Sequence, residues 1–486
     1  MTETISRIDN YIGGGWQSPR AGNYIDVVDP AVGAPFGQCA DSDASDIDDA
    51  VIAARDAFAA WSSTPSADRA QCLNRIADRI EERLDEFAAA ESRDSGKPIA
   101  LARSLDIPRA IANLRFFAAA ATQFASEAHA TENAAINYTL RQPIGIVGCI
   151  SPWNLPLYLF TWKIAPALAA GNTVIAKPSE VTPFTAKLFA QACIDADLPA
   201  GVLNIVQGVG ARAGGALISH PAIKAISFTG STRTGAAIAA EAAKTFKKVS
   251  LEMGGKNPTL VFADWDASEA NWQTILRSAF SNQGQICLCG SRILVERSIY
   301  ASFRDAFVAR AKKMRVGDPD DASSDLGAVV SKAHFDKIMG CIAVARDEGG
   351  TILCGGDRVK VDGRCAHGWF IAPTVIEGLG PACATNQDEI FGPVVTLQPF
   401  DDENHALELA NATAYGLASS VWTSGLSRAH RVAAKLDAGI VWINCWMRRD
   451  LRTPFGGVKQ SGLGREGGFE ALRFFTEAKN VCIQID

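Results

Sequence analysis

The run Ile144-Gly145-Ile146-Val147-Gly148-Cys149-Ile150 is short and apolar, and it marks the point where the character of the chain changes. A strand that is buried on both faces has such a continuous apolar run rather than an alternating pattern. Further short runs follow, each separated from the next by a helix-length segment, at residues 173–177, 203–206, 225–228 and 249–251. Strands that alternate with helices at this spacing predict a doubly wound parallel sheet, which binds its ligand at the carboxyl ends of the strands.

The rest of the chain predicts a second sheet and a helical start. From about residue 257 to 445 the alternation resumes, with candidate strands at 259–262, 292–296, 394–397 and 440–443. The first third has apolar residues at helical spacing in 46–61, 66–91 and 101–117. Two β-like segments, 137–141 and 480–485, belong to neither sheet. We therefore expect an α/β protein with two sheet domains.

Composition excludes several classes of protein. A length of 486 residues predicts two or three domains, and a net charge of −6 without a basic stripe argues against nucleic-acid binding. Residues 1–6 lack a secretory pattern, and the apolar stretch 155–171 carries Lys163 and two prolines, so we expect a buried helix there and no membrane span. The twelve cysteines are scattered without zinc-ligand spacing, which predicts a reduced, cytoplasmic protein with no metal site.

Cys287 is the candidate nucleophile. It follows Gly284-Gln285-Ile286, and Glu252, beside Gly254 and Gly255, is a candidate base. A thiolate is the reactive form of cysteine, and the six histidines give little support to a Cys–His–Asn protease, so an acidic base acting through water fits better.

Most isolated cysteines are core residues. We expect this of Cys149, Cys193 and Cys482, and Cys289 is the weaker local competitor of Cys287.

Polar residues follow several of the predicted strands. Asn154 lies in a loop fixed by two prolines, where it is either structural or polarises a carbonyl. Ser231 follows Gly230 at a strand-to-helix junction, which fits either a helix N-cap or a phosphate site. Lys177 and Glu180 end the second strand, where an acidic side chain either binds ribose hydroxyls or is solvated.

The glycine-rich segment 208–214 is a poor dinucleotide fingerprint. Its third glycine is one place too late and no suitable strand and tight turn precede it, so we interpret it as a loop.

Seven motifs in order carry a resemblance to a known family. They are residues 151–154, 177–180, 228–231, 251–256, 284–287, 389–393 and 454–457. Over essentially the whole chain this series resembles the NAD(P)-dependent aldehyde dehydrogenase superfamily, and segments 154–158, 286–289 and 446–453 resemble its 2-aminomuconate and 2-hydroxymuconate semialdehyde dehydrogenase branch.

The resemblance implies a covalent mechanism. Cys287 attacks the aldehyde, and Asn154 with the Cys287 backbone N–H holds the oxyanion. Hydride transfer to NAD leaves a thioester, which water hydrolyses with Glu252 as base. The cofactor-binding residues implied in this way are Ser151, Trp153, Lys177, Ser179, Glu180, Ser231, Met253, Glu389 and Phe391, and Glu180 favours NAD over NADP.

The resemblance also implies a domain division. A Rossmann-like NAD-binding domain covers 1–120 and 142–254, an α/β catalytic domain covers 255–469, and a small β oligomerisation flap is formed by 121–141 and 470–486. Through this flap we expect a homo-oligomer, either a dimer or a tetramer.

Arginines near the expected aldehyde entrance point to a substrate that bears a carboxylate, because Arg binds carboxylates in a bidentate manner. We expect Arg103 and Arg452 to bind it, and Arg109 or Arg449 with less support; surface pairing with Asp106 and Asp450 is the alternative. Trp162 and Leu288 are further candidate substrate residues.

The expected substrate is 2-aminomuconate 6-semialdehyde, as formed in aromatic and tryptophan catabolism. 2-Hydroxymuconate semialdehyde and a retinal-like aldehyde are alternatives, and the arginines disfavour a cationic aldehyde. A catalytically silent relative and a thiol esterase are the rival functions.

Overall fold

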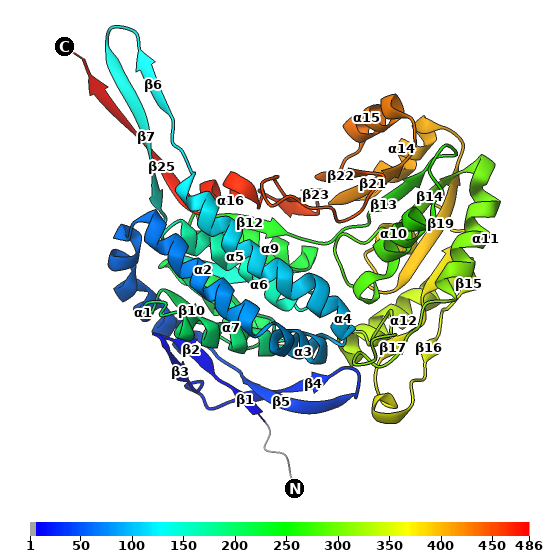
Figure 1. The fold of residues 1–486 in the computed structure, drawn as a ribbon, viewed down its shortest axis with the longest axis horizontal. Helices are drawn as coiled ribbons and strands as arrows, with labels where there is room; N and C mark the ends of the chain where they lie inside the picture. The colour runs from blue at the N-terminus through cyan, green and yellow to red at the C-terminus, as the bar shows by residue number, and fades with distance from the viewer. Residues whose placement is uncertain (1–5, 486) are drawn as a thin grey trace.

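Two sheets covered by helices form the two lobes of the molecule, and a β flap extends away from the first lobe (Figure 1). The computed structural model describes residues 6–485. The α/β class predicted from the sequence is confirmed.

The first sheet has the strand order β24-β12-β11-β8-β9-β10-β2-β3. Its parallel centre consists of β8 (Ile146–Ile150), β9 (Thr173–Lys177), β10 (Leu203–Ile205), β11 (Ile223–Thr229) and β12 (Lys248–Glu252). The chain runs from β8 outward to β9 and β10, then crosses to β11 on the other side of β8. The loops after β8 and β11 therefore leave the sheet in opposite directions, and a crevice opens between them at the carboxyl ends.

Helices cover this sheet as the apolar patterns predicted. They include α1 (Ala44–Ser63), α2 (Ser66–Glu82), α5 (Ile107–Thr122), α6 (Pro156–Ala169), α7 (Phe184–Asp195) and α9 (Thr232–Ala243). Every residue of α6 is buried, so its apolar character reflects the protein core. None of the helices among residues 6–485 is long and apolar enough to cross a membrane.

The second lobe contains a sheet of order β15-β18-β19-β14-β13-β21-β22. Its strands are β13 (Pro258–Val261), β14 (Arg292–Glu296), β15 (Thr351–Cys354), β18 (Thr374–Glu377), β19 (Val394–Phe400), β21 (Ala418–Trp422) and β22 (Ile440–Ile443). Its helices include α10 (Glu269–Phe280), α11 (Tyr300–Ala311), α12 (Lys332–Asp347), α14 (Glu403–Asn411) and α15 (Leu426–Lys435). The four strands predicted for this region all lie in the sheet.

The flap is an antiparallel sheet of β6 (Ala128–Thr131), β7 (Ala135–Pro143) and β25 (Thr476–Gln484). The predicted β segments 137–141 and 480–485 are thus outside both main sheets, as expected. The large apolar side chains of Ile136, Leu140 and Ile483 are exposed on it.

The helical interpretation of the first third is wrong for its beginning. Residues 6–40 form β1 (Ser6–Ile8), β2 (Asn10–Ile12), β3 (Gly15–Gln17), β4 (Tyr24–Asp29) and β5 (Ala34–Ala40). Strands of three residues are too short to show a period, and β2 is buried throughout, so alternation cannot identify it.

Two further elements differ from the sequence interpretation. The predicted helix 66–91 is broken at Arg83 (φ −114°), after which α3 (Leu84–Ser95) begins. The strand β24 (Gly462–Leu463) pairs with β12 in the first sheet, although the predicted division assigns it to the catalytic domain. The domain boundaries themselves stay a prediction.

Candidate active site

A cavity of about 180 Å³ lies at the crevice between the two lobes. The loop after β8 contributes Trp153 and Asn154 to its wall, and the start of α9 contributes Ser231. From the second lobe come Cys287 and Glu389. The structure therefore brings candidate residues from both predicted domains around one space.

The loop that carries Cys287 has an unusual backbone. Asn282 (φ 53°), Gln283 (φ 55°) and Gly284 (φ 71°) are all left-handed. A Cβ on Gly284 would lie 2.0 Å from the carbonyl oxygen of Gly392, so this position requires glycine. Asn257 Nδ2 donates to the carbonyl oxygen of Cys287 at 2.7 Å, which fixes the far side of the loop.

Cys287 is half-buried, whereas Cys149, Cys193 and Cys289 are buried. The expectation of a core position is wrong for Cys482, which is exposed because it lies in the flap. Burial, reinforced by the negative charges of Glu389 and Glu252, raises the pKa of the Cys287 thiol. Burial thus disfavours the thiolate, which is the reactive form of cysteine.

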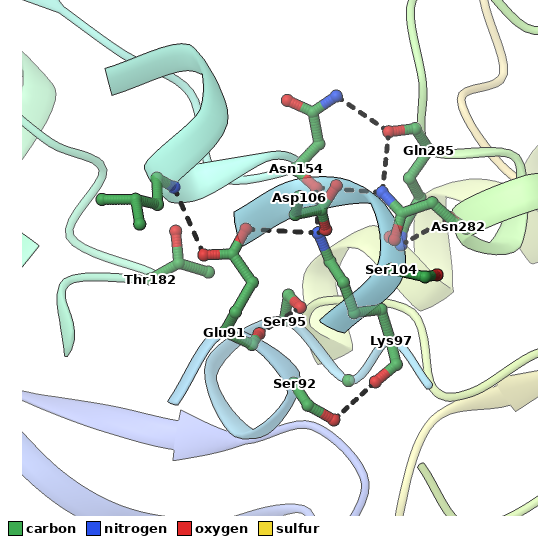
Figure 2. A network of polar contacts seen from close by, with 12 residues as sticks. Glu91, Ser92, Ser95, Lys97, Ser104, Asp106, Asn154, Thr182, Asn282 and Gln285 are labelled. Atoms are coloured by element: carbon green, nitrogen blue, oxygen red, sulfur yellow. Dashed lines mark hydrogen bonds and ion pairs between the residues drawn. The ribbon is translucent and has the colours of Figure 1, made fainter. Parts of the chain in front are cut away.

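Asn154 is held by hydrogen bonds on both its backbone and its side chain, as Figure 2 shows. Its side-chain nitrogen donates to the carbonyl oxygen of Gln285 at 2.8 Å. Its own carbonyl oxygen accepts from Lys97 Nζ at 3.1 Å and from Asn282 Nδ2 at 2.9 Å. Since one amide hydrogen is used, the second remains to donate toward the cavity.

Glu252 ends β12 and is 3% exposed. Within residues 6–485 neither of its carboxylate oxygens has a hydrogen-bond partner. Burial and then the neighbouring charge of Glu466 raise its pKa well above the ordinary range, although Lys163 and other cations act in the opposite direction. Lys163 Nζ is bound to Glu466 Oε1 at 2.9 Å, so its charge is largely engaged there.

Glu389 and Phe391, two of the predicted cofactor-binding residues, line the cavity. Glu389 Oε1 accepts from the backbone N–H of Gly255 at 2.9 Å, and a Cβ on Gly254 would lie 2.2 Å from Glu389 Oε2. The ring centroids of Phe391 and Trp153 are 5.3 Å apart with an edge-to-face orientation. The paired glycines thus make room for the carboxylate, and the two aromatic rings form one wall.

The predicted adenosine-ribose residues lie together at the end of β9. Lys177 Nζ is 3.2 Å from Glu180 Oε2. Ser179 Oγ accepts from the backbone N–H of Val181 at 3.2 Å, which shapes the turn between them. Ser231 caps α9 by accepting from the Thr234 N–H at 3.2 Å, so the N-cap alternative is realised at a helix end that also borders the cavity.

Comparison with known proteins identifies the family. The model of the aldehyde dehydrogenase family matches residues 16–481. The chain belongs to this family.

Its relatives are similar over nearly their whole length. The chain is 48% identical over 480 residues to the 2-aminomuconic semialdehyde dehydrogenase of Danio rerio, covering 98% of each protein. It is 45% identical over 487 residues to the 2-hydroxymuconic semialdehyde dehydrogenase of Pseudomonas sp. (strain CF600), covering 99% of this chain and 100% of the relative. The crystal structure of PnpE from Pseudomonas sp. WBC-3 in complex with nicotinamide adenine dinucleotide matches with a TM-score of 0.96 at 42% identity, covering 98% of each chain. The resemblance inferred from the seven motifs is confirmed.

The arginines of this aldehyde dehydrogenase family member do not lie as the sequence suggested. Arg103 is exposed and bonded to Asp85, and Arg452 is exposed and bonded to Asp450 at 2.6 Å, so both are paired at the surface. Arg449, by contrast, is half-buried.

Arg449 lies beside Trp162, one of the predicted substrate residues. Its guanidinium carbon is 4.0 Å from the ring centroid of Phe455 and 5.0 Å from that of Trp162, and its NH1 group donates to the Tyr158 hydroxyl at 2.7 Å. It is close enough to Cys287 to favour the thiolate. Across residues 6–485 no carboxylate forms an ion pair with it.

Trp162 and Leu288, the other two predicted substrate residues, are buried in the same apolar cluster, against which Cys287 packs. Ser151 and Met253 are also buried, and a Cβ on Gly235 of α9 would lie 2.2 Å from Met253 Sδ. The side chain of Met253 therefore fills the space beside the start of α9.

Sequence reasoning missed three residues of the cavity wall: Thr229, His334 and Lys337. The His334 ring lies 5.0 Å from Trp153, and its Nε2 is 2.7 Å from the carbonyl oxygen of Phe391. Burial lowers the pKa of His334 to about 4, so the ring is neutral. It follows a serine at the start of α12, which is an ordinary helix start and gave no signal of a site.

Residues 6–485 contain no group of three or more His, Cys, Asp or Glu side chains arranged to hold a metal ion.

Proposed function

We propose that this protein oxidises an aldehyde to a carboxylic acid with NAD as the oxidant. The observation that carries the proposal is the placement of Cys287 and Asn154 at one cavity, with Glu252 buried at the end of the adjoining strand. Cys287 attacks the carbonyl carbon as a thiolate, and the oxygen becomes an oxyanion that accepts from Asn154 Nδ2 and the Cys287 backbone N–H. Loss of a hydride from that carbon leaves a thioester on Cys287.

Glu252 is the proposed base for the second half of the reaction. It removes a proton from water, the resulting hydroxide attacks the thioester carbon, and the C–S bond breaks to release the acid and the Cys287 thiolate. A carboxylate without hydrogen-bond partners is free to accept that proton.

The crevice fits NAD, which accepts the hydride when it is bound. The crevice lies at the switch point of the first sheet, between the loops after β8 and β11, where dinucleotides bind in doubly wound folds. The hydroxyl oxygens of Ser151 and Thr229, both at this edge of the sheet, are buried without a partner among the described residues, and Ser231 begins a helix whose N–H groups favour an anion. The Glu180 carboxylate would repel a 2′-phosphate, which favours NAD over NADP. The PnpE complex with nicotinamide adenine dinucleotide supports this choice.

We further propose that the substrate is 2-aminomuconate 6-semialdehyde, whose carboxylate binds Arg449. A half-buried arginine without an acidic partner is suited to an anionic ligand. Arg103 and Arg452 already hold acidic neighbours, so they are less suited than the sequence suggested. The name of the Danio rerio relative supports the amino compound, and that of the Pseudomonas relative makes 2-hydroxymuconate semialdehyde the second candidate.

Steady-state kinetics test the proposal. NADH formation from 2-aminomuconate 6-semialdehyde, 2-hydroxymuconate semialdehyde and a neutral aldehyde of similar length should show the highest kcat/KM for the amino compound. Cys287→Ala should abolish NADH formation, whereas a catalytically silent protein would show none in the wild type. A thiol esterase would instead cleave an activated ester without NAD and oxidise no aldehyde.

Arg449→Met tests the carboxylate site. Loss of a charge-assisted contact should lower kcat/KM for the acidic semialdehyde by about 10- to 100-fold and spare the neutral aldehyde. Arg452→Ala is the matched control and should change neither substrate's kcat/KM by more than about twofold. Equal losses on both substrates in Arg449→Met would contradict carboxylate binding.

We also propose that the protein is a homo-oligomer assembled through the flap and that it works in the cytoplasm. Exposed apolar side chains on β7 and β25 support the first point, and sedimentation of the purified protein tests it. The free state of all twelve cysteines supports a reducing compartment.

A further inference from the structure

A fully buried cluster of charges lies beside Asn154 (Figure 2). It consists of Lys97, Glu91 and Asp106, and each of the three is 0% exposed. Lys97 Nζ donates to Asp106 Oδ2 and lies 3.4 Å from Glu91 Oε1. Its third contact is the carbonyl oxygen of Asn154 at 3.1 Å.

Two of these charged residues, Asp106 and Lys97, lie in segments with an irregular backbone. Asp106 ends a π-helical turn, Ala102–Asp106, inserted between α4 (Ile99–Leu101) and α5. π-Turns inside helices are rare and frequent at functional sites. Lys97 follows Gly96, whose left-handed backbone (φ 74°) ends α3, and the Ser92 hydroxyl donates to the Lys97 carbonyl oxygen at 2.6 Å.

The ammonium of Lys97 remains charged in this environment. Burial opposes the charge, but Asp106 and then Glu91 outweigh it, so the pKa of Lys97 is raised. Burial raises the pKa of Glu91 to about 7 and also raises that of Asp106. The cluster therefore keeps the Lys97 cation next to two carboxyl groups whose protonation burial favours.

Such a cluster is an inefficient source of stability. Desolvating three charged groups costs several kcal/mol per ion in general, and apolar replacements of buried ion pairs are often neutral or stabilising. A role in fixing geometry accounts better for its position.

The cluster is connected to both lobes through Asn154. The Asn154 carbonyl oxygen receives Lys97 Nζ from the first lobe and Asn282 Nδ2 from the second, at 3.1 and 2.9 Å. Asn282 Nδ2 also reaches the Gln285 carbonyl oxygen at 3.2 Å, which is the acceptor of the Asn154 side chain. The loop of Cys287 is thus joined to Asn154, the proposed oxyanion donor, at the Asn154 carbonyl oxygen. Lys97 donates to the same oxygen.

We propose that Lys97, held by Glu91 and Asp106, is a positioning residue that fixes the Asn154 backbone, so that the two oxyanion donors, one from each lobe, meet the aldehyde oxygen at one point. Lys97 touches neither the cavity nor the nucleophile, so its effect passes through Asn154. The inference rests on the proposed role of Asn154 in the reaction.

A double-mutant cycle tests it on the rate of the first-turnover NADH burst. Lys97→Met should slow the burst by about 10- to 100-fold, since a small misplacement of a catalytic donor has effects of this size. The KM for NAD should stay within about twofold. In an Asn154→Ala background the same substitution should slow the burst by less than about threefold, because the group it positions is already gone.

Lys247→Met is the matched control. Lys247 is another buried lysine, whose Nζ donates to the His220 carbonyl oxygen near the opposite end of β12, and its loss should lower the melting temperature and leave the burst rate unchanged. Should Lys97→Met fail to fold, Asp106→Asn carries the same cycle, because it keeps the shape of the side chain and removes the charge that holds Lys97.

The outcomes separate the two proposals. If Lys97→Met slows the burst equally in the wild-type and Asn154→Ala backgrounds, the positioning role alone is overturned. The same holds if Lys97→Met lowers the melting temperature and leaves the burst unchanged. A normal burst in Asn154→Ala would overturn the role of Asn154 and the positioning role together.

Discussion

Two parts of the site around Cys287 differ in how their polar groups are satisfied: the part with Asn154, called the rigid side, and the part with Glu252, called the unpartnered side. On one side Asn154 uses its side-chain nitrogen and its carbonyl oxygen in three hydrogen bonds to buried groups. On the other side both carboxylate oxygens of Glu252 are buried and, within the described part of the chain, unpartnered. Buried polar groups are normally paired, so the Glu252 side is the exception.

The difference matches two chemical tasks. A group that stabilises an oxyanion acts best when its dipole is already fixed, because no reorganisation is then needed during the reaction. A general base must instead gain and lose a proton and contact a water molecule at one stage only. We therefore interpret the rigid side as serving the first half-reaction and the unpartnered side as serving the second.

The largest effect is expected on the unpartnered side. Glu252→Gln keeps the shape of the side chain and removes the base, so steady-state turnover should fall by about 10²- to 10⁴-fold. The first-turnover burst of NADH should persist, because hydride transfer precedes hydrolysis, and mass spectrometry of the quenched protein should find the acyl group on Cys287. Loss of the burst to the same degree as turnover would mean that Glu252 acts in both halves.

The rigid side should show the complementary pattern. Asn154→Ala removes one oxyanion donor, which in general costs about 10²- to 10³-fold in rate. Here the first turnover itself should slow, and less acyl-enzyme should accumulate than in Glu252→Gln. Stopped-flow measurement of the first turnover checks this, with Phe160→Leu as a control that perturbs the neighbouring core of α6 but no donor to the aldehyde. A fast burst followed by slow turnover would reverse the assignment of the two sides.

The sequence predicts those features of the site that depend on neighbouring residues in the chain, and it does not predict those that depend on distant segments. The loop of Cys287 and the end of the strand before Asn154 carry glycine and proline signals within a few residues, so both could be found. The lack of partners around Glu252 depends on segments more than 200 residues away, such as Glu466, and no local pattern reports it.

The charged residues show the same limit. Glu91 lies in α3, Lys97 in the loop after it and Asp106 at the end of the π-turn before α5, and no local pattern distinguishes these three residues from surface charges. Arg452 stands nearer than Arg449 to the motif at 454–457, yet Arg449 is the one that points to the apolar cluster. Side-chain direction in such loops is set by tertiary packing, so residue type alone could suggest an arginine but not choose it.

A smaller effect concerns pH. The pKa of Glu252 is raised above its ordinary value of 4.5, so protonation disables the base at a higher pH than for a free glutamate. As pH falls through the raised pKa, the rate of thioester hydrolysis should decline, and as pH rises through it the rate should recover. Single-turnover hydrolysis of the isolated acyl-enzyme over a pH series measures this decline, which is the acid limb of the pH–rate profile. In Glu252→Gln the acid limb should vanish. A limb that persists in that variant would belong to another group.

The smallest effect is a displacement of that limb. The charge of Glu466 raises the pKa of Glu252, and Glu466 also engages Lys163, whose positive charge lowers it. Glu466→Gln removes the first influence and frees the second, so both changes favour the Glu252 carboxylate. The acid limb should move to lower pH by roughly 0.5 to 1 unit. Glu470→Gln is the control, since Glu470 lies four residues further along the chain and is paired with Arg473 at the surface. A shift to higher pH in Glu466→Gln would mean that Glu466 favours the ionised form of Glu252. Glu252 would then depend on a neighbouring residue for its reactive form, as Asn154 depends on its hydrogen-bond partners for its position.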